Sequence, residues 1–115
     1  MTRVLLMLLG SLLVSGPCAA AVEIRGSRSC AHWLEEARFA KSPTEMNRVP
    51  QLVTRSWFLG YLSGRADESG KSFMKGTDND SIFLWLDNYC RAHPTKALES
   101  AGTELVRELI RENKP

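Results

Sequence analysis

Neither sign of charge dominates this chain, whose fifteen lysine and arginine residues face thirteen aspartate and glutamate residues for a formal net charge of +2. So small an excess gives no electrostatic reason to expect nucleic acid or an anionic membrane as the partner. At 115 residues the chain has room for one domain, and little room for a Rossmann or barrel domain that holds a large cofactor. No alternating pattern of useful length predicts a β-strand.

Reactive side chains are few, with two histidines and three cysteines in the whole chain. The sequence GYLSG at 60–64 contains a serine between glycines, but it is not the G-x-S-x-G of a nucleophile elbow and no predicted strand precedes it. His32 lies at helical spacing from Glu35 and Glu36, yet two ligands do not make a metal site. We therefore expect no enzyme activity, no bound metal and no cofactor.

The first apolar run, Val4–Val14, covers 11 residues, whereas about 20 are needed to span a bilayer. The run follows the basic residue Arg3 and precedes a Gly-Pro pair and several alanines, which is the order of a secretory signal peptide. We expect residues 1–20 to be cleaved, leaving an exported chain without a membrane span. The alternative is lipidation of Cys18, against which Pro17 stands because a lipobox needs a small residue there.

Cleavage would leave two of the three cysteines, Cys30 and Cys90. Two cysteines in an exported chain of about 95 residues predict one disulfide, formed in an oxidising compartment. The bridge closes a loop of about 60 residues, which contributes on the order of 4 kcal/mol by the chain-entropy argument. Pairing also removes the remaining candidate thiol nucleophile.

Helical periodicity accounts for most of the exported chain, after a flexible lead-in over residues 21–29. Apolar spacing, cap residues and helix breakers predict four helices, at 30–40, 50–64, 78–92 and 95–112. A linker over 41–47 and a polar loop over 65–77 separate the first three. The predicted fold class is all-α, a compact four-helix domain over residues 30–112 in which the disulfide ties the first helix to the third.

The second predicted helix carries Val53, Trp57, Gly60, Tyr61 and Gly64 at the spacing of one buried face. Its two glycines lie one turn apart, which indicates close approach of a neighbouring helix. The alternative is that Gly64 simply ends the helix.

Two pairs of residues stand out as candidates for function. His32 and His93 lie two or three residues from the paired cysteines. Either the disulfide brings them together as a pH-responsive pair titrating between pH 5 and 7, or they are two ordinary surface histidines. Phe73 and Met74 stand in a charged loop. They either tuck beneath that loop or form an apolar patch for a protein partner or a homodimer.

The early Cys30 with Trp33-Leu34 and the late YCRAHP at 89–94, before a closing amphipathic helix, resemble the HdeA/HdeB-like periplasmic proteins. The resemblance implies a helical fold bridged by two cysteines and the activity of an acid-stress chaperone that binds unfolding proteins. The stretch WFLGYLSG at 57–64, followed by IFLWLDNYCRAHP and ALESAGTELVREL, is also similar to the Tai-type immunity proteins of type VI secretion. Those are periplasmic helical proteins that block a cell-wall amidase toxin.

These resemblances predict an exported, non-enzymatic periplasmic protein-binding module, serving as an acid- or envelope-stress chaperone whose partners are unfolded clients. Under acid, carboxylates would protonate and a dimer or the core would open. Apolar surface from Phe73, Met74, Phe83 or Trp85 would then reach the clients. The alternative is a rigid immunity protein that inhibits one secreted amidase toxin.

Overall fold

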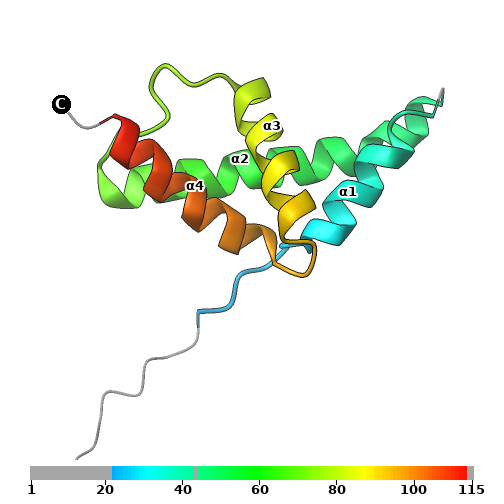
Figure 1. The fold of residues 1–115 in the computed structure, drawn as a ribbon, viewed down its shortest axis with the longest axis horizontal. Helices are drawn as coiled ribbons and strands as arrows, with labels where there is room; N and C mark the ends of the chain where they lie inside the picture. The colour runs from blue at the N-terminus through cyan, green and yellow to red at the C-terminus, as the bar shows by residue number, and fades with distance from the viewer. Residues whose placement is uncertain (1–21, 43, 114–115) are drawn as a thin grey trace, which may run out of the picture.

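A computed structural model of the chain describes residues 22–42 and 44–113, so the predicted signal peptide and Cys18 lie outside the described residues. The described part contains four α-helices and one short 3-10 helix, and no strand (Figure 1). The elements are α1 (Cys30–Phe39), η1 (Glu45–Arg48), α2 (Val49–Ser69), α3 (Asn79–Ala92) and α4 (Leu98–Glu112). The predicted all-α, four-helix fold is confirmed.

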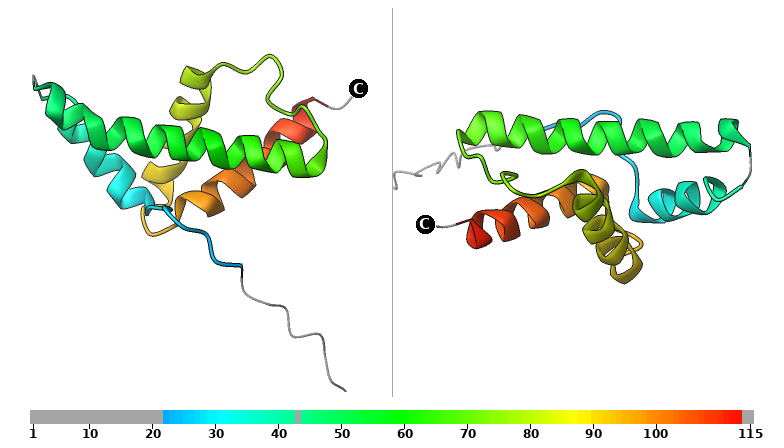
Figure 2. Two further views of the ribbon diagram at one scale, coloured as in Figure 1. Left: turned by 180° about the vertical axis from the view of Figure 1, so that it is seen from behind. Right: turned by 90° about the horizontal axis from the view of Figure 1, so that it is seen from above.

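The long helix α2 forms a layer of its own. Seen from above, α1, α3 and α4 all lie on one side of it (Figure 2, right). α1 packs along the N-terminal half of α2, and α4 packs along the C-terminal half (Figure 1). α3 stands between α1 and α4 and contacts both. The segment α1–η1–α2 is therefore a helical hairpin, and its closed end projects beyond the other two helices.

The hydrophobic core lies where the four helices meet. Its buried members come from every helix and from the loop after α2: Cys30, Trp33, Phe58, Leu62, Phe73, Ile82, Phe83, Leu86, Cys90, Leu98, Ala101, Leu105, Val106 and Leu109. Full burial of one large apolar side chain contributes about 1.5–3 kcal/mol, so this cluster is the main source of stability.

The predicted disulfide between Cys30 and Cys90 is present, and it joins the first turn of α1 to the last turns of α3. The lead-in, expected to be flexible, is hydrogen-bonded from residue 25 onward. Trp57 Nε1 donates to the Arg25 carbonyl at 2.9 Å, and the Leu98 amide donates to the Arg28 carbonyl at 2.8 Å. These bonds attach the lead-in to α2 and to the start of α4.

The buried face of α2 differs from the predicted one. Thr54, Phe58 and Leu62 point into the core, whereas Val53 is exposed. The predicted face, which contains Val53 and Trp57, has the same four-residue spacing as the buried face. Because Thr54 is polar, the pattern of apolar residues does not identify the face that is actually buried. The helix also continues past the predicted end at residue 64, to Ser69, and stops at Gly70 in the left-handed conformation.

The predicted close approach at Gly60 and Gly64 is wrong. A Cβ atom on either residue would meet nothing within 4 Å, and Gly64 lies inside the helix and not at its end. The close approach is at Gly102 of α4, where a Cβ atom would lie 2.6 Å from Cε1 of Tyr61. The glycine that lets two helices meet therefore belongs to the contact between α4 and α2.

α4 begins at Leu98, three residues later than predicted. Residues 93–97 form a turn instead, and their carbonyl groups accept hydrogen bonds from the first turn of α1: Cys30 N donates to Lys96 O at 2.7 Å, and Ala31 N donates to Pro94 O at 2.9 Å. α1 starts as predicted, with the Ser29 side chain accepting from the His32 amide.

Replacing both bridging cysteines, Cys30→Ala with Cys90→Ala, should lower the free energy of unfolding by about 4 kcal/mol, because the bridge spans 60 residues of sequence. Urea unfolding followed by circular dichroism would measure the loss, with the reduced wild-type protein as the matched control. A loss below about 1 kcal/mol in both samples would contradict a stabilising role for the bridge.

The substitution Gly102→Ala should destabilise the fold by about 1–3 kcal/mol, because the added methyl group overpacks the contact with Tyr61. The Tyr61 ring cannot move aside easily, since it stacks on Trp57 and its hydroxyl accepts a hydrogen bond from Arg65. As controls, Gly60→Ala and Gly64→Ala should each raise stability by about 0.5–1 kcal/mol. Thermal unfolding of the three variants would test this order, and equal effects would refute it.

Candidate functional site

The four apolar residues predicted to bind a partner do not form an exposed surface. Phe73 is 2% exposed and Phe83 is 8% exposed, while Met74 and Trp85 are half-buried against the core. Of the two interpretations of the 73–74 loop, the structure favours the one in which the aromatic ring tucks inward. Asn113 Nδ2 holds the loop there by donating to the Phe73 carbonyl at 2.6 Å. These side chains reach a partner only if the helices separate.

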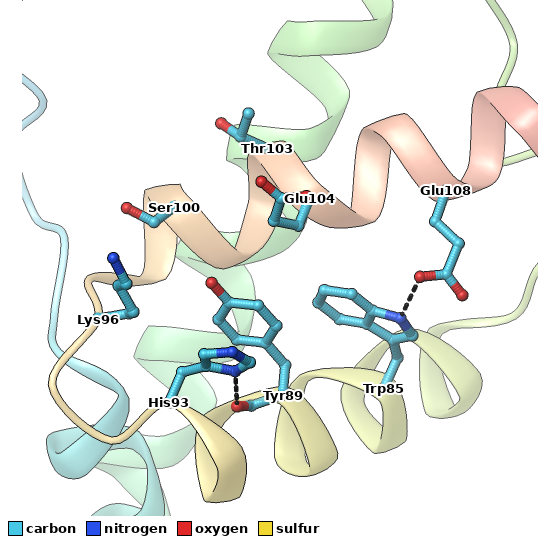
Figure 3. Close-up of a pocket in the computed structure, with 8 residues that line it drawn as sticks. All are labelled: Trp85, Tyr89, His93, Lys96, Ser100, Thr103, Glu104 and Glu108. Carbon is cyan, nitrogen blue, oxygen red and sulfur yellow. Dashed lines mark hydrogen bonds between the residues drawn. The ribbon is translucent and has the colours of Figure 1, made fainter.

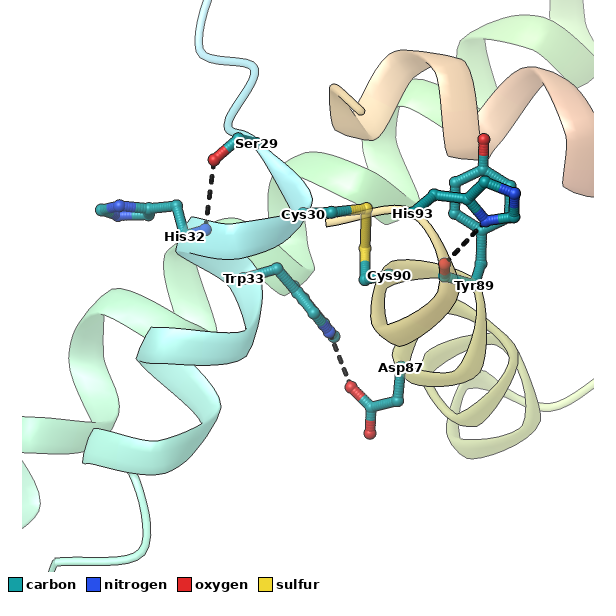
Figure 4. Close-up of a disulfide and its surroundings, with 8 residues drawn as sticks. All are labelled: Ser29, Cys30, His32, Trp33, Asp87, Tyr89, Cys90 and His93. Carbon is teal, nitrogen blue, oxygen red and sulfur yellow. Dashed lines mark hydrogen bonds between the residues drawn. A yellow bond between two sulfur atoms is a disulfide. The ribbon is translucent and has the colours of Figure 1, made fainter. Parts of the chain in front are cut away.

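The two histidines are not brought together by the disulfide. Figure 4 shows their imidazoles on opposite sides of the bridge. His32 Nε2 lies 3.0 Å from Oε1 of the buried Glu36 within α1. The ring of His93 stacks on Tyr89 at 4.3 Å, with Nδ1 3.0 Å from the Tyr89 carbonyl. His32 lies two residues from Cys30 and so faces a different side of α1, and His93 lies beyond the end of α3 as its C-cap, so the shared bridge does not align the two rings.

Indole groups hydrogen-bonded to carboxylates connect α3 to both of its neighbours. Beside the disulfide, Trp33 Nε1 of α1 donates to Asp87 Oδ1 at 2.6 Å (Figure 4). On the other side of α3, Trp85 Nε1 donates to Glu108 Oε2 of α4 at 3.0 Å (Figure 3). Hydrogen bonds to a charged group are about twice as strong as neutral ones, so these two links help to fix α3 between α1 and α4.

A groove of about 620 Å³ lies between α3 and α4 (Figure 3). One wall is the stack of Trp85, Tyr89 and His93, and the facing wall includes Ser100 and Glu104. Within the described residues no hydrogen bond activates Ser100, and Glu104 is paired with Arg107. The groove therefore contains no arrangement of nucleophile and base.

Residues 22–42 and 44–113 contain no group of three or more His, Cys, Asp or Glu side chains placed to hold a metal ion. No helix among them combines the length and apolar character needed to cross a membrane.

Five of the seven large apolar side chains that are more than half exposed in the described residues belong to the α1–η1–α2 hairpin. They are Phe39, Met46, Val49, Leu52 and Val53, and we call this segment the hairpin tip. The exposed charged residues Arg38, Lys41, Glu45 and Arg48 lie in the same segment. An exposed apolar cluster with a polar rim is typical of a protein-binding surface. The sequence analysis missed it, since it assigned Val53 to a buried face and gave the other four side chains no role.

Asp78 is an acid-sensitive group at the start of α3. Its side chain accepts a hydrogen bond from the Ser81 amide at 2.7 Å, and this bond lowers the pKa of the carboxyl group from its ordinary value. A lowered native pKa means that the cap stabilises the fold fully above the ordinary pKa, near pH 4. That contribution is lost as the pH falls through the native pKa.

The substitution Asp78→Asn should therefore flatten the decline of unfolding free energy between pH 4 and pH 2, because asparagine caps a helix without titrating. Stability at pH 7 should stay close to that of the wild type. Asp80→Asn is the matched control, since it removes a charge from the same first turn and leaves the cap in place. Urea unfolding across this pH range would measure both slopes, and a wild-type slope in Asp78→Asn would contradict the role of the cap.

The described residues thus present an apolar hairpin tip and a polar groove. No family model, curated protein or solved structure matches this chain.

Proposed function

We propose that this chain is an exported, non-enzymatic protein-binding module of the periplasm. The observation that carries the proposal is the hairpin tip, where three successive elements expose large apolar side chains on a small domain. Such surfaces gain free energy when a partner covers them, at about 25 cal/mol for each Å² of apolar area removed from water. The partner class is protein, since exposed apolar side chains among charged residues of both signs are typical of protein interfaces and form no enclosed site for a small ligand.

The favoured role is that of an acid-stress chaperone similar to HdeA and HdeB. Acid would weaken several contacts at once, because each depends on a carboxylate. Asp87 accepts a hydrogen bond from Trp33, Glu108 accepts one from Trp85, and Asp78 caps α3. The Glu99 side chain likewise accepts a hydrogen bond from Ser27 of the lead-in. α3 would loosen from α4 while the disulfide kept it tied to α1. Phe73 and Phe83 would then add to the surface that the tip already offers.

The projecting shape of the hairpin favours the alternative, an immunity protein that inhibits a secreted cell-wall amidase toxin. The closed end of the hairpin extends beyond α3 and α4 (Figure 1), so it can enter a cleft without a clash from the rest of the fold. In this role the fold would stay rigid at neutral pH, and the tip would fill the active-site cleft of one enzyme.

The chaperone role predicts that the wild-type protein suppresses aggregation of an acid-denatured client at pH 2–3, with a rise in ANS fluorescence and a change in sedimentation between pH 7 and pH 2. The double variant Phe39→Ser with Met46→Ser should lose most of this protection, because it removes apolar area from the tip. Leu84→Ser is the control, since Leu84 is also more than half exposed but lies on α3 and not in the hairpin. Equal loss in both variants would contradict a specific role for the tip.

A wild-type protein that stays compact and inert from pH 7 to pH 2 would overturn the chaperone role. The immunity role would then be tested by capturing an amidase at neutral pH, with the same two variants compared for retention. Loss of capture in Phe39→Ser/Met46→Ser alone would identify the tip as the inhibitory surface.

A further inference from the structure

Two rows of side chains, each with a spacing of four residues, line the polar groove between α3 and α4 (Figure 3). The rows are Trp85, Tyr89 and His93 on the α3 side, and Ser100, Glu104 and Glu108 on α4. Residues four apart lie on one face of a helix, about 6 Å apart along its axis. The α4 row therefore extends along the groove for about 12 Å.

The two ends of the groove differ. At one end Trp85 Nε1 donates to Glu108 Oε2 at 3.0 Å, which is the one side-chain hydrogen bond between α3 and α4 in the described part of the chain. At the other end Lys96, from the turn between the two helices, lies beside His93 (Figure 3). Only the first end is bridged, so the rest of the groove is accessible to a ligand.

Polar groups without a protein partner line the unbridged part of the groove. Within residues 22–42 and 44–113, the Lys96 ammonium and the hydroxyls of Tyr89 and Ser100 take part in no hydrogen bond or ion pair. Glu104 and Glu108 each have one carboxylate oxygen in a hydrogen bond and the other without a donor among these residues. Water satisfies such groups at a surface, and a ligand with matching donors and acceptors can replace it.

The charges that line the groove are separated by sign. Lys96 lies at the end near Ser100, whereas Glu104 and Glu108 lie about one and two turns of α4 further along (Figure 3). A complementary ligand carries an anionic group at one end and a cationic group at the other. The distance along α4 from Ser100 to a point between the two glutamates is about 9 Å.

A short peptide with free termini meets these requirements. It carries a carboxylate at one end and an ammonium group at the other, and three extended residues span about 10 Å. The groove volume of about 620 Å³ lies within the range of sites that bind small ligands. Midway along the groove, the Tyr89 hydroxyl can both donate and accept, as hydrogen bonding to a peptide backbone requires.

We propose that the groove between α3 and α4 binds a short peptide of about three residues with free termini. The peptide carboxylate lies against Lys96 and Ser100, its ammonium group lies against Glu104 and Glu108, and its backbone contacts the Tyr89 hydroxyl. This site is separate from the hairpin tip, so it goes beyond the proposed function and does not rest on it.

Titration with trialanine at pH 7, followed by NMR of the labelled chain without its first 20 residues, tests the location of the site. The three indole N–H groups report separately, because Trp85 lines the groove while Trp33 donates to Asp87 and Trp57 to the Arg25 carbonyl. We expect a saturable shift of the Trp85 resonance alone, which the variant Trp85→Phe identifies by its loss. Dialanine spans only about 7 Å and should bind more weakly.

Modified peptides and matched variants test the two ends of the site. Trialanine amide lacks the carboxylate and N-acetyl-trialanine lacks the ammonium group, so each should bind the wild type about three-fold more weakly. The variant Lys96→Gln should bind trialanine and its amide equally, and Glu104→Gln should lose most of the preference over the acetylated peptide. Lys75→Gln is the matched control, since it removes an exposed lysine from the loop after α2, and it should keep both preferences.

Two results would overturn the peptide site. One is the absence of a saturable Trp85 shift at about 10 mM trialanine, where a site with a millimolar Kd is mostly occupied. The other is an unchanged preference for trialanine over its amide in Lys96→Gln. Loss of client protection or amidase capture with peptide binding retained would overturn the proposed function alone, and the converse result would overturn only the peptide site.

Discussion

The arrangement of α1 against α3 depends on the covalent bond between Cys30 and Cys90. Both helices are short, at 10 and 14 residues, and neither has the length to be stable alone. The bridge places Trp33 beside α3, where its indole reaches Asp87, and it brings the start of α1 to the turn before α4. With α1 and α3 joined in this way, α2 and α4 complete the hydrophobic core by packing on their other side.

The contacts around α3 are of different kinds. The disulfide and the apolar core join it to its neighbours without charged groups, whereas its polar links end on Asp87 and Glu108 and its first turn is capped by Asp78. The cap lowers the pKa of Asp78, so its contribution to stability is lost as the pH falls through the native pKa of that carboxyl group. Acid therefore acts on the start of α3, while the disulfide keeps this helix joined to α1.

The sequence was sufficient for the helix count and the disulfide, because these depend on local spacing and on the number of cysteines. It was insufficient for the face of α2, where Thr54 occupies a buried position and Val53 an exposed one. Exposure of the hairpin tip was missed because it depends on where the other helices end, which local spacing does not encode. Whether a row of residues on α2 is buried depends on which helix covers it. Gly102 of α4 makes room for Tyr61 where α4 meets α2, and it lies 41 residues after Tyr61 in the chain.

The first turn of α1 obtains its hydrogen-bond partners from the far end of the chain. The amides of Cys30 and Ala31 donate to the carbonyls of Lys96 and Pro94, which lie in the turn between α3 and α4. A helix of 10 residues with its first donors unpaired is marginal in water. The first helix to emerge during synthesis therefore has no partners for these amides until the turn between α3 and α4 has formed.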